Sequence, residues 1–159
     1  MSAVATEAEV AAGTTYVHYR SKDELVVAAY LEVRHDLGRA AASAPVDARP
    51  DESFRALWLA VYDHLVANRA DARFLQQVDA SPYAEAAQAR AAAEADDAFA
   101  EALARRSIGN NLVALPRRIL GDLAFGPAVR LAASGASVPR DTLVRVADAC
   151  WRAVSSASG

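Results

Sequence analysis

Apolar residues recur along this chain mainly at helical spacing, and runs of β-branched residues are rare. The clearest stripe joins Phe54, Leu57, Trp58, Val61 and Leu65, whose i, i+3, i+4, i+7, i+11 spacing puts them on one helix face. Glycines and prolines lie mostly between such stretches. The pattern predicts an all-α fold, with a loop over 108–115 and helices at about 22–43, 51–67, 70–79, 82–106, 116–134 and 139–156.

Two segments carry residues that commonly begin helices. Ser21 and Glu24 form a capping box, in which the serine hydroxyl accepts from the amide of Glu24 and the glutamate carboxylate accepts from the cap amide. Ser81 is followed by Pro82, which suits the first helical position. The helix that begins at Pro82 could run to Arg106, and its helicity would come from the high helix propensity of alanine more than from an apolar stripe.

Composition narrows the class of protein. The 159 residues suit one domain, or one domain with a small appendage, and 53% are hydrophobic, which suffices for a core. A net charge of -3 excludes a protein that coats nucleic acid non-specifically. There is no apolar run of membrane-span length and no signal peptide, so we expect a soluble cytoplasmic protein with no membrane partner. The single cysteine, Cys150, excludes an internal disulfide framework and lies on an apolar stripe, as a buried inert thiol would.

The first 25 residues carry the most specific pattern, a short helix, a tight turn and a second short helix with small residues at its front. This arrangement is typical of a helix-turn-helix, in which small residues let the helix N-terminus approach the DNA. Residues 10–22 contain no acid, so the local charge favours phosphate. The residues expected to contact DNA are Ala12, Gly13, Thr14, Tyr16, His18 and Lys22.

The block VAAGTTYVHYRSKDELVVAAYLEV, residues 10–33, resembles the TetR (tetracycline-repressor-like) family of bacterial transcriptional regulators. The match is most specific there and looser over the rest of the chain. The resemblance implies an incomplete helix-turn-helix DNA-binding region over 1–22, the remnant of a helix-turn-helix head. It also implies a C-terminal helical bundle over 23–159 that binds a ligand and dimerises.

Two departures from the family's pattern affect the DNA-binding region. The family's DNA-binding domain has three helices, and this sequence begins inside the second, so the first helix is absent from it. Glu9 stands where the family usually has a glycine in the turn. A glutamate in a left-handed turn position costs about 1 kcal/mol and brings a negative charge towards phosphate. The motif as it stands is therefore an incomplete DNA reader.

The resemblance also implies an effector cavity inside the C-terminal bundle. Candidate lining residues are aromatic or polar groups close to apolar stripes, namely Trp58, Tyr62, Phe74, Gln77, Tyr83 and Phe99. Asp122, in an otherwise apolar turn, could hydrogen-bond a ligand or a symmetry mate. For each aromatic or amide residue alone, core packing is the alternative, and for Asp122 it is solvation or pairing with an arginine.

No catalytic, metal or cofactor motif emerges from the sequence. It lacks a nucleophile elbow, a phosphate loop and a zinc-protease motif, so we do not expect an enzyme. His35 and His64 stand alone without a second ligand at metal-binding spacing. Asp96 and Asp97 are interpreted as the solvated face of an alanine-rich helix.

The last two long helices, 116–134 and 139–156, are expected to form a homodimer, since both carry apolar or small residues on more than one face. Ile119, Leu120 and Leu123 are assigned to the chain's own core. Trp151 joins the apolar face of the last helix and suits an interface. The strip of small residues available to a partner is Gly121, Ala124, Ala128 and Ala132.

Two functional hypotheses follow. The first is a ligand-responsive transcriptional regulator of the repressor type that binds operator DNA when the full helix-turn-helix is present and releases it when an unknown small-molecule effector binds. The second is a DNA-binding-deficient helical protein of the same fold that binds a ligand or forms heterodimers with a full-length relative. The sequence upstream of the start codon discriminates between them, because an in-frame first helix restores the first hypothesis.

The 159-residue chain is expected to bind duplex DNA weakly and without sequence preference, because the first helix that would hold the recognition helix in place is missing from it. An electrophoretic mobility shift at physiological salt is the measurement. Nanomolar, sequence-selective binding would contradict this expectation. In a chain with the complete motif, Lys22→Ala should weaken binding about equally for all DNA sequences, since this residue is expected at a phosphate.

Overall fold

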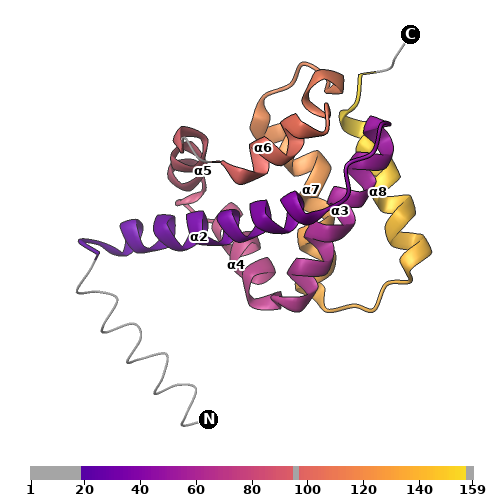
Figure 1. The fold of residues 1–159 in the computed structure, drawn as a ribbon. Coiled ribbons are helices and arrows are strands. Elements are labelled where there is room, and N and C mark those ends of the chain that lie inside the picture. Colours follow the sequence, from indigo (N-terminus) through magenta and orange to yellow (C-terminus); the bar gives the residue numbers. More distant parts are fainter. Residues whose placement is uncertain (1–18, 95–96, 157–159) are drawn as a thin grey trace.

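The computed structural model describes residues 19–94 and 97–156 (Figure 1). Within these residues the chain forms seven α-helices, one 3-10 turn and a single isolated bridge between Leu112 and Ser155. The elements are α2 (Lys22–Ser43), α3 (Pro50–Ala67), α4 (Arg69–Asp79), α5 (Ala84–Ala93), α6 (Ala98–Arg105), η1 (Gly109–Asn111), α7 (Arg117–Ser134) and α8 (Arg140–Val154). The predicted all-α fold is confirmed.

Helix α2 begins where the capping box predicts. The hydroxyl of Ser21 accepts a hydrogen bond from the amide of Glu24 at 3.2 Å. The carboxylate of Glu24 accepts from the amide of Arg20 at 2.9 Å, one residue before the amide that the sequence pattern suggested. The first bond satisfies a donor that the first helical turn leaves free, and the second holds the residue before the cap. The first turns of α2 extend beyond the bundle in Figure 1.

The single helix predicted over 82–106 is wrong. Ser81 lies in a turn, where its hydroxyl donates to the carbonyl of Val78 at 2.6 Å and accepts from the amide of Tyr83 at 3.2 Å, and the helix begins only at Ala84. This helix, α5, ends at Ala93, and α6 starts afresh at Ala98. Alanine propensity alone did not sustain a long helix, because a helix in a protein is held mainly by the packing of an apolar face.

The core is centred on α3, which packs against α2, α7 and α8. All five residues of its predicted stripe are buried, and the largest, Trp58, is fully enclosed. Its indole Nε1–H donates to the carbonyl of Ala124 on α7 at 2.9 Å. Its ring stacks on Tyr62 with the centroids 5.8 Å apart. Trp58 therefore joins α3 to α7 by a polar as well as an apolar contact.

The two faces of α7 are largely the reverse of those predicted, although Leu120 packs against the core and Gly121 is exposed as expected. The small residues Ala124, Ala128 and Ala132 are buried inside the chain, where they let α7 lie close to its neighbours. Ile119 and Leu123 remain 42% and 40% exposed, although they were assigned to the core. The size of the side chains explains which face of α7 is buried, because a closely packed helix contact accommodates alanine better than leucine.

Two ion pairs fasten α8 to α3. Arg55 donates to Asp148 at 2.7 Å, and Arg140 donates to Asp63 at 2.8 Å. The ring centroids of Trp151 and the core residue Phe54 are 5.3 Å apart, so part of this tryptophan belongs to the chain's own core. The expected burial of Cys150 is confirmed, and burial raises the pKa of its thiol.

The end of α6 is tied to the end of α2 by a buried arginine. Arg106 donates from Nη1 to the carbonyl of Ala102 at 2.8 Å and from Nη2 to the carbonyl of Ala44. Removal from water lowers the pKa of this guanidinium. Ala44 directly follows the last residue of α2. The side chain of Arg106 therefore links the C-terminal end of α2 to the C-terminal end of α6.

Substitution of two helical glycines by alanine is expected to change the stability of the protein in opposite directions. A Cβ on Gly38 of α2 would lie 2.8 Å from the Cβ of Ala98 and 2.9 Å from the amide nitrogen of Phe99, whereas a Cβ on Gly121 of α7 would meet nothing within 4 Å. Gly38→Ala should lower the free energy of unfolding by about 1–3 kcal/mol, since overpacking outweighs the gain in helix propensity. Gly121→Ala should raise it by up to about 1 kcal/mol.

Urea unfolding followed by circular dichroism, at equal protein concentration, measures both variants. The close approach of α2 and α6 at Gly38 would be contradicted if Gly38→Ala were as stable as Gly121→Ala.

Candidate functional site

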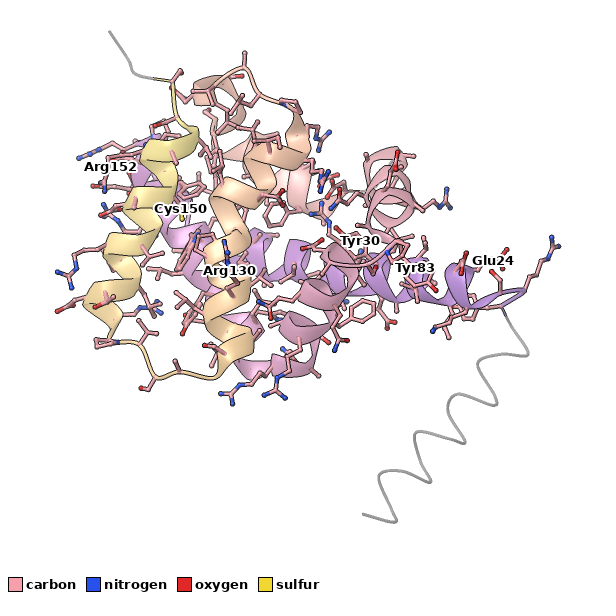
Figure 2. The ribbon with its side chains drawn as sticks, turned by 180° about the vertical axis from the view of Figure 1, so that it is seen from behind. Glu24, Tyr30, Tyr83, Arg130, Cys150 and Arg152 are labelled. Carbon is pink, nitrogen blue, oxygen red and sulfur yellow. The ribbon has the colours of Figure 1, made fainter. Side chains whose placement is uncertain are left out.

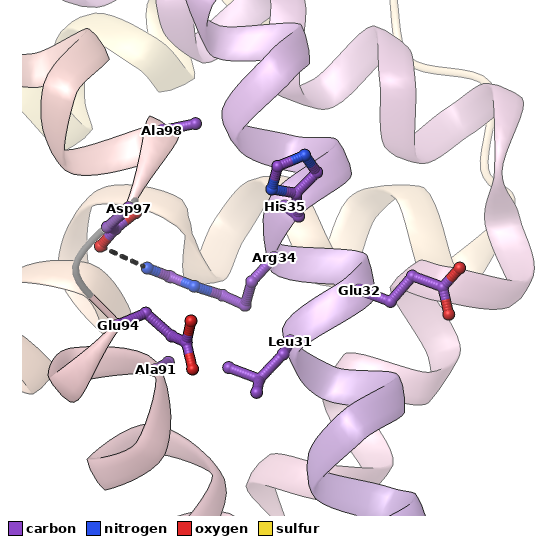
Figure 3. A pocket seen from close by; sticks show the side chains of 8 residues that line it. All are labelled: Leu31, Glu32, Arg34, His35, Ala91, Glu94, Asp97 and Ala98. Atoms are coloured by element: carbon purple, nitrogen blue, oxygen red, sulfur yellow. Dashed lines mark ion pairs between the residues drawn. The ribbon is translucent and has the colours of Figure 1, made fainter.

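A groove of about 270 Å³ runs between α2 and the segment that carries α5 and α6 (Figure 3). One wall is a single helix and the other is built where two short helices meet. The lining residues are Leu31, Glu32, Arg34 and His35 from α2, Ala91 and Glu94 from the end of α5, and Asp97 and Ala98 from the start of α6. Apolar and charged side chains of both signs thus share one small hollow.

Asp97 organises the second wall of the groove. One carboxylate oxygen accepts hydrogen bonds from the amides of Phe99 and Ala100, at 3.0 and 3.1 Å, and so caps the N-terminus of α6. The other oxygen lies 3.5 Å from a guanidinium nitrogen of Arg34 on α2 and 3.8 Å from one of Arg117 on α7. A helix N-terminus favours a negative charge, so the cap and the ion pairs support each other.

Asp97 is therefore not part of a solvated face, as its sequence context suggested. Its side chain is only 18% exposed and connects three helices. The strong preference of aspartate for the N-cap position is the signal in the sequence that could have found it.

Arg34 reaches from α2 across the groove (Figure 3). Its guanidinium lies over the ring of Phe99, 5.4 Å from the centroid, which is a favourable position for a cation. Phe99 in turn meets Phe125 of α7 edge to face, with the centroids 5.0 Å apart. The groove is thus joined to α7 both through charges, by Asp97 and Arg117, and through aromatic rings.

The residues predicted to line a ligand cavity are dispersed in the structure. Trp58 and Tyr62 are buried in the core, Phe74 and Tyr83 are half-buried, and Gln77 and Asp122 are exposed. None of the seven lines the groove, and Phe99 alone borders it, as the support of Arg34. Their contact with a ligand stays a prediction. The sequence pattern marked neither Arg34 nor Asp97 as a site residue, because they lie in different elements and come together only through the fold.

A second group of polar residues lies where α2, α4 and α7 approach one another. Burial raises the pKa of the Tyr30 hydroxyl. Burial also raises the pKa of the Asp79 carboxyl, and the nearby charge of Asp122 adds to the effect, while Gln88 opposes it by donating a hydrogen bond to Asp79 at 3.4 Å.

Of the predicted DNA contacts, Ala12, Gly13, Thr14, Tyr16 and His18 lie outside the described residues. Lys22 is exposed and is the first residue of α2. Its role at a DNA phosphate remains a prediction.

Across residues 19–94 and 97–156 no three histidine, cysteine or acidic side chains cluster in a way that could hold a metal ion. In the same part of the chain no helix is both long and apolar enough to cross a membrane.

Comparison with known proteins identifies the family. The model of the tetracyclin repressor-like C-terminal domain matches residues 51–155, which covers α3 to α8. The chain belongs to the TetR family. Among curated proteins none matches the chain.

Two solved structures share the TetR fold. A TetR-family transcriptional regulator from Haemophilus influenzae RD is 24% identical, with a TM-score of 0.64 over 96% of this chain and 82% of that one. A TetR-family transcription regulator from Marinobacter aquaeolei VT8 is 16% identical, with a TM-score of 0.59 over 90% of this chain and 78% of that one. At these sequence identities the similarity shows a shared fold alone.

Replacement of Asp97 should separate its capping role from its charge. Asp97→Ala removes both and is expected to lower the free energy of unfolding by about 1–2 kcal/mol, mostly through loss of the cap, because partly exposed ion pairs contribute less. Asp97→Asn keeps a cap acceptor and should lose less than half as much. Urea unfolding measures both, and equal losses for the two variants would contradict the capping role.

Proposed function

We propose that this TetR-family chain is a ligand-responsive transcriptional regulator, of the repressor type, that binds a small molecule in the groove between α2 and α6. It acts as a homodimer through α7 and α8, and operator DNA is bound through the helix-turn-helix region that precedes α2 when that motif is complete. In such a dimer, the two recognition helices must lie about 34–36 Å apart to grip successive major grooves.

The observation that carries this proposal is the position of the groove. One wall is α2, which begins directly after the helix-turn-helix-like residues, and the other is α6, whose cap Asp97 also faces α7. A ligand that prefers one separation of these walls changes the position of α2 relative to the dimer. Its differential affinity for the two arrangements sets the change in DNA affinity.

The outer surface of α7 and α8 supports the dimer. Figure 2 shows the two helices side by side across the near face of the molecule. On α7, Ile119 and Leu123 are exposed although they are large and apolar. On α8, the residues on the corresponding stripe are small or apolar and at most half-buried, namely Thr142, Val146, Ala149 and Ala153. A surface of this kind is typical of an interface.

The groove limits the effector to a small polar molecule. Its volume of about 270 Å³ lies just below the range of about 300–1,000 Å³ that drug-sized ligands occupy. Arg34 on one wall reaches towards Asp97 and Glu94 on the other, His35 also lines the groove, and Leu31 and Ala91 offer apolar contact. A compact molecule with both a charged and an apolar end suits this lining.

A thermal-shift screen of small acids, amines and zwitterions tests the proposal, supplemented by any compound retained on protein purified under native conditions. A binding compound should raise the Tm of the unmutated protein and of the control Val66→Trp, on an exposed position of α3 outside the groove. It should not raise the Tm of Leu31→Trp, in which the indole fills the groove. Stabilisation of all three proteins alike would contradict a site in the groove.

The dimer is tested separately by light scattering of the unmutated protein at micromolar concentration. The expected mass is that of two chains, and the mass of one chain would contradict the proposal. Ala128 was expected on the strip of small residues that faces a partner, but it is buried in the chain's own core, so Ala128→Glu would place a carboxylate there and would not probe the interface.

A further inference from the structure

We propose that the two copies of α7 cross antiparallel at Gly126, so that Asp122 of each copy pairs with Arg130 of the other. This arrangement rests on the proposed dimer and specifies its register. Three features of α7 support this register: the residues that point outward, the space around Gly126, and the charges of Asp122 and Arg130, which have no partner among the described residues.

The outward stripe of α7 consists of Ile119, Leu123, Gly126 and Arg130. Their i, i+4, i+7, i+11 spacing places them on one face, opposite the buried Ala124, Ala128 and Ala132 of the same helix. A Cβ on Gly126 would meet only the end of the Arg130 side chain, at 3.8 Å. The backbone is therefore bare at the middle of the stripe, where a second helix could approach more closely than elsewhere.

The sequence around Gly126 is complementary to itself when read in opposite directions. A two-fold axis that passes between two antiparallel copies of α7 at residue 126 sets up pairs across the interface. Each residue that precedes Gly126 in one copy then lies near the residue that follows Gly126 by the same number of positions in the other copy. Asp122 and Arg130 are each four residues away, so each acid meets a base of the other copy. When two helices cross at about −50°, their i±4 rows lie parallel, and this aligns the row Asp122, Gly126, Arg130 with its symmetry mate.

The apolar residues fit the same register. Leu123 lies three residues before the crossing and faces Val129 of the second copy, which is half-buried in its own chain. Ile119 lies seven residues before it, level with Ala133 of the second copy, which is buried in its own chain and gives Ile119 no side-chain partner. Leu123 would thus be covered by a smaller apolar side chain, which leaves room for the close approach at Gly126.

The charges disfavour the alternative orientation. Neither Asp122 nor Arg130 has an ion-pair partner among the described residues of its own chain, and both are exposed. If the two copies of α7 were parallel, Asp122 would face Asp122 and Arg130 would face Arg130. Like charges in those positions repel each other. The antiparallel register is therefore favoured because it forms two ion pairs and also because it avoids this repulsion.

A charge-exchange experiment tests the register. Asp122→Arg and Arg130→Asp, made singly, should each weaken the dimer at least tenfold, because each puts like charges together twice. The double variant restores opposite charges and should return to within about threefold of the unmutated dissociation constant. Analytical ultracentrifugation gives the constants, and circular dichroism shows that each variant is folded. Glu85→Arg, an exposed charge reversal on α5, is the control and should have no effect.

A cross-link tests the crossing point independently. Gly126→Cys places two thiols at the two-fold axis, within the Cα separation of about 4.4–6.8 Å that a disulfide requires. Mild oxidation should give a covalent dimer, whereas Ala89→Cys, exposed on α5, should not. The native Cys150 is buried and should contribute little.

The outcomes separate this inference from the proposed function. A monomeric unmutated protein overturns both. A stable dimer in which the single charge variants dissociate no more readily, or in which the double variant is no better than the single ones, overturns the Gly126 register and leaves the dimer standing. A failure of Gly126→Cys to cross-link within that stable dimer also overturns the crossing.

Discussion

The hydrogen bond from the indole of Trp58 to the carbonyl of Ala124 fixes how α7 lies on the bundle. It points the alanine side of α7 towards α3, so the opposite side, with Ile119 and Leu123, must face outward. Pro127 lies inside α7 and cannot donate to the carbonyl four residues before it, which weakens the helix's own bonding at that turn. A donor from α3 at the adjacent carbonyl therefore holds α7 where its internal bonding is poorest.

The polar counterpart of this contact lies at the groove. Asp97 caps α6 and faces arginines from α2 and α7, so its one carboxylate links three helices. These ion pairs are long and partly exposed, and pairs of this kind contribute little to stability. Weak links of this sort suit a joint between α2 and the bundle, because a ligand needs only modest differential affinity to rearrange them.

The sequence predicted the elements that strong local signals specify. Helix α2 follows from its capping box and α3 from its apolar stripe, and both appear within one residue of the expected bounds. Where alanine dominates, the pattern failed, because alanine fits a helix interior, a tight contact or a solvated face equally well. The broken helix after Ser81 and the reversed faces of α7 share that cause. The groove was also missed, since Arg34 and Asp97 are brought together by tertiary packing that no local pattern encodes.

The groove is linked to the proposed dimer face through α7. Phe125, which supports Phe99 beneath Arg34, directly precedes Gly126, where the second copy is proposed to cross. A ligand that moves Arg34 would shift the Phe99–Phe125 contact and, with it, the turn of α7 that carries the crossing. Coupling between two sites is reciprocal, so an effector that stabilises one crossing geometry must itself bind more tightly to the dimer held in that geometry. Ligand affinity and dimer affinity should therefore change together, through a path only a few residues long.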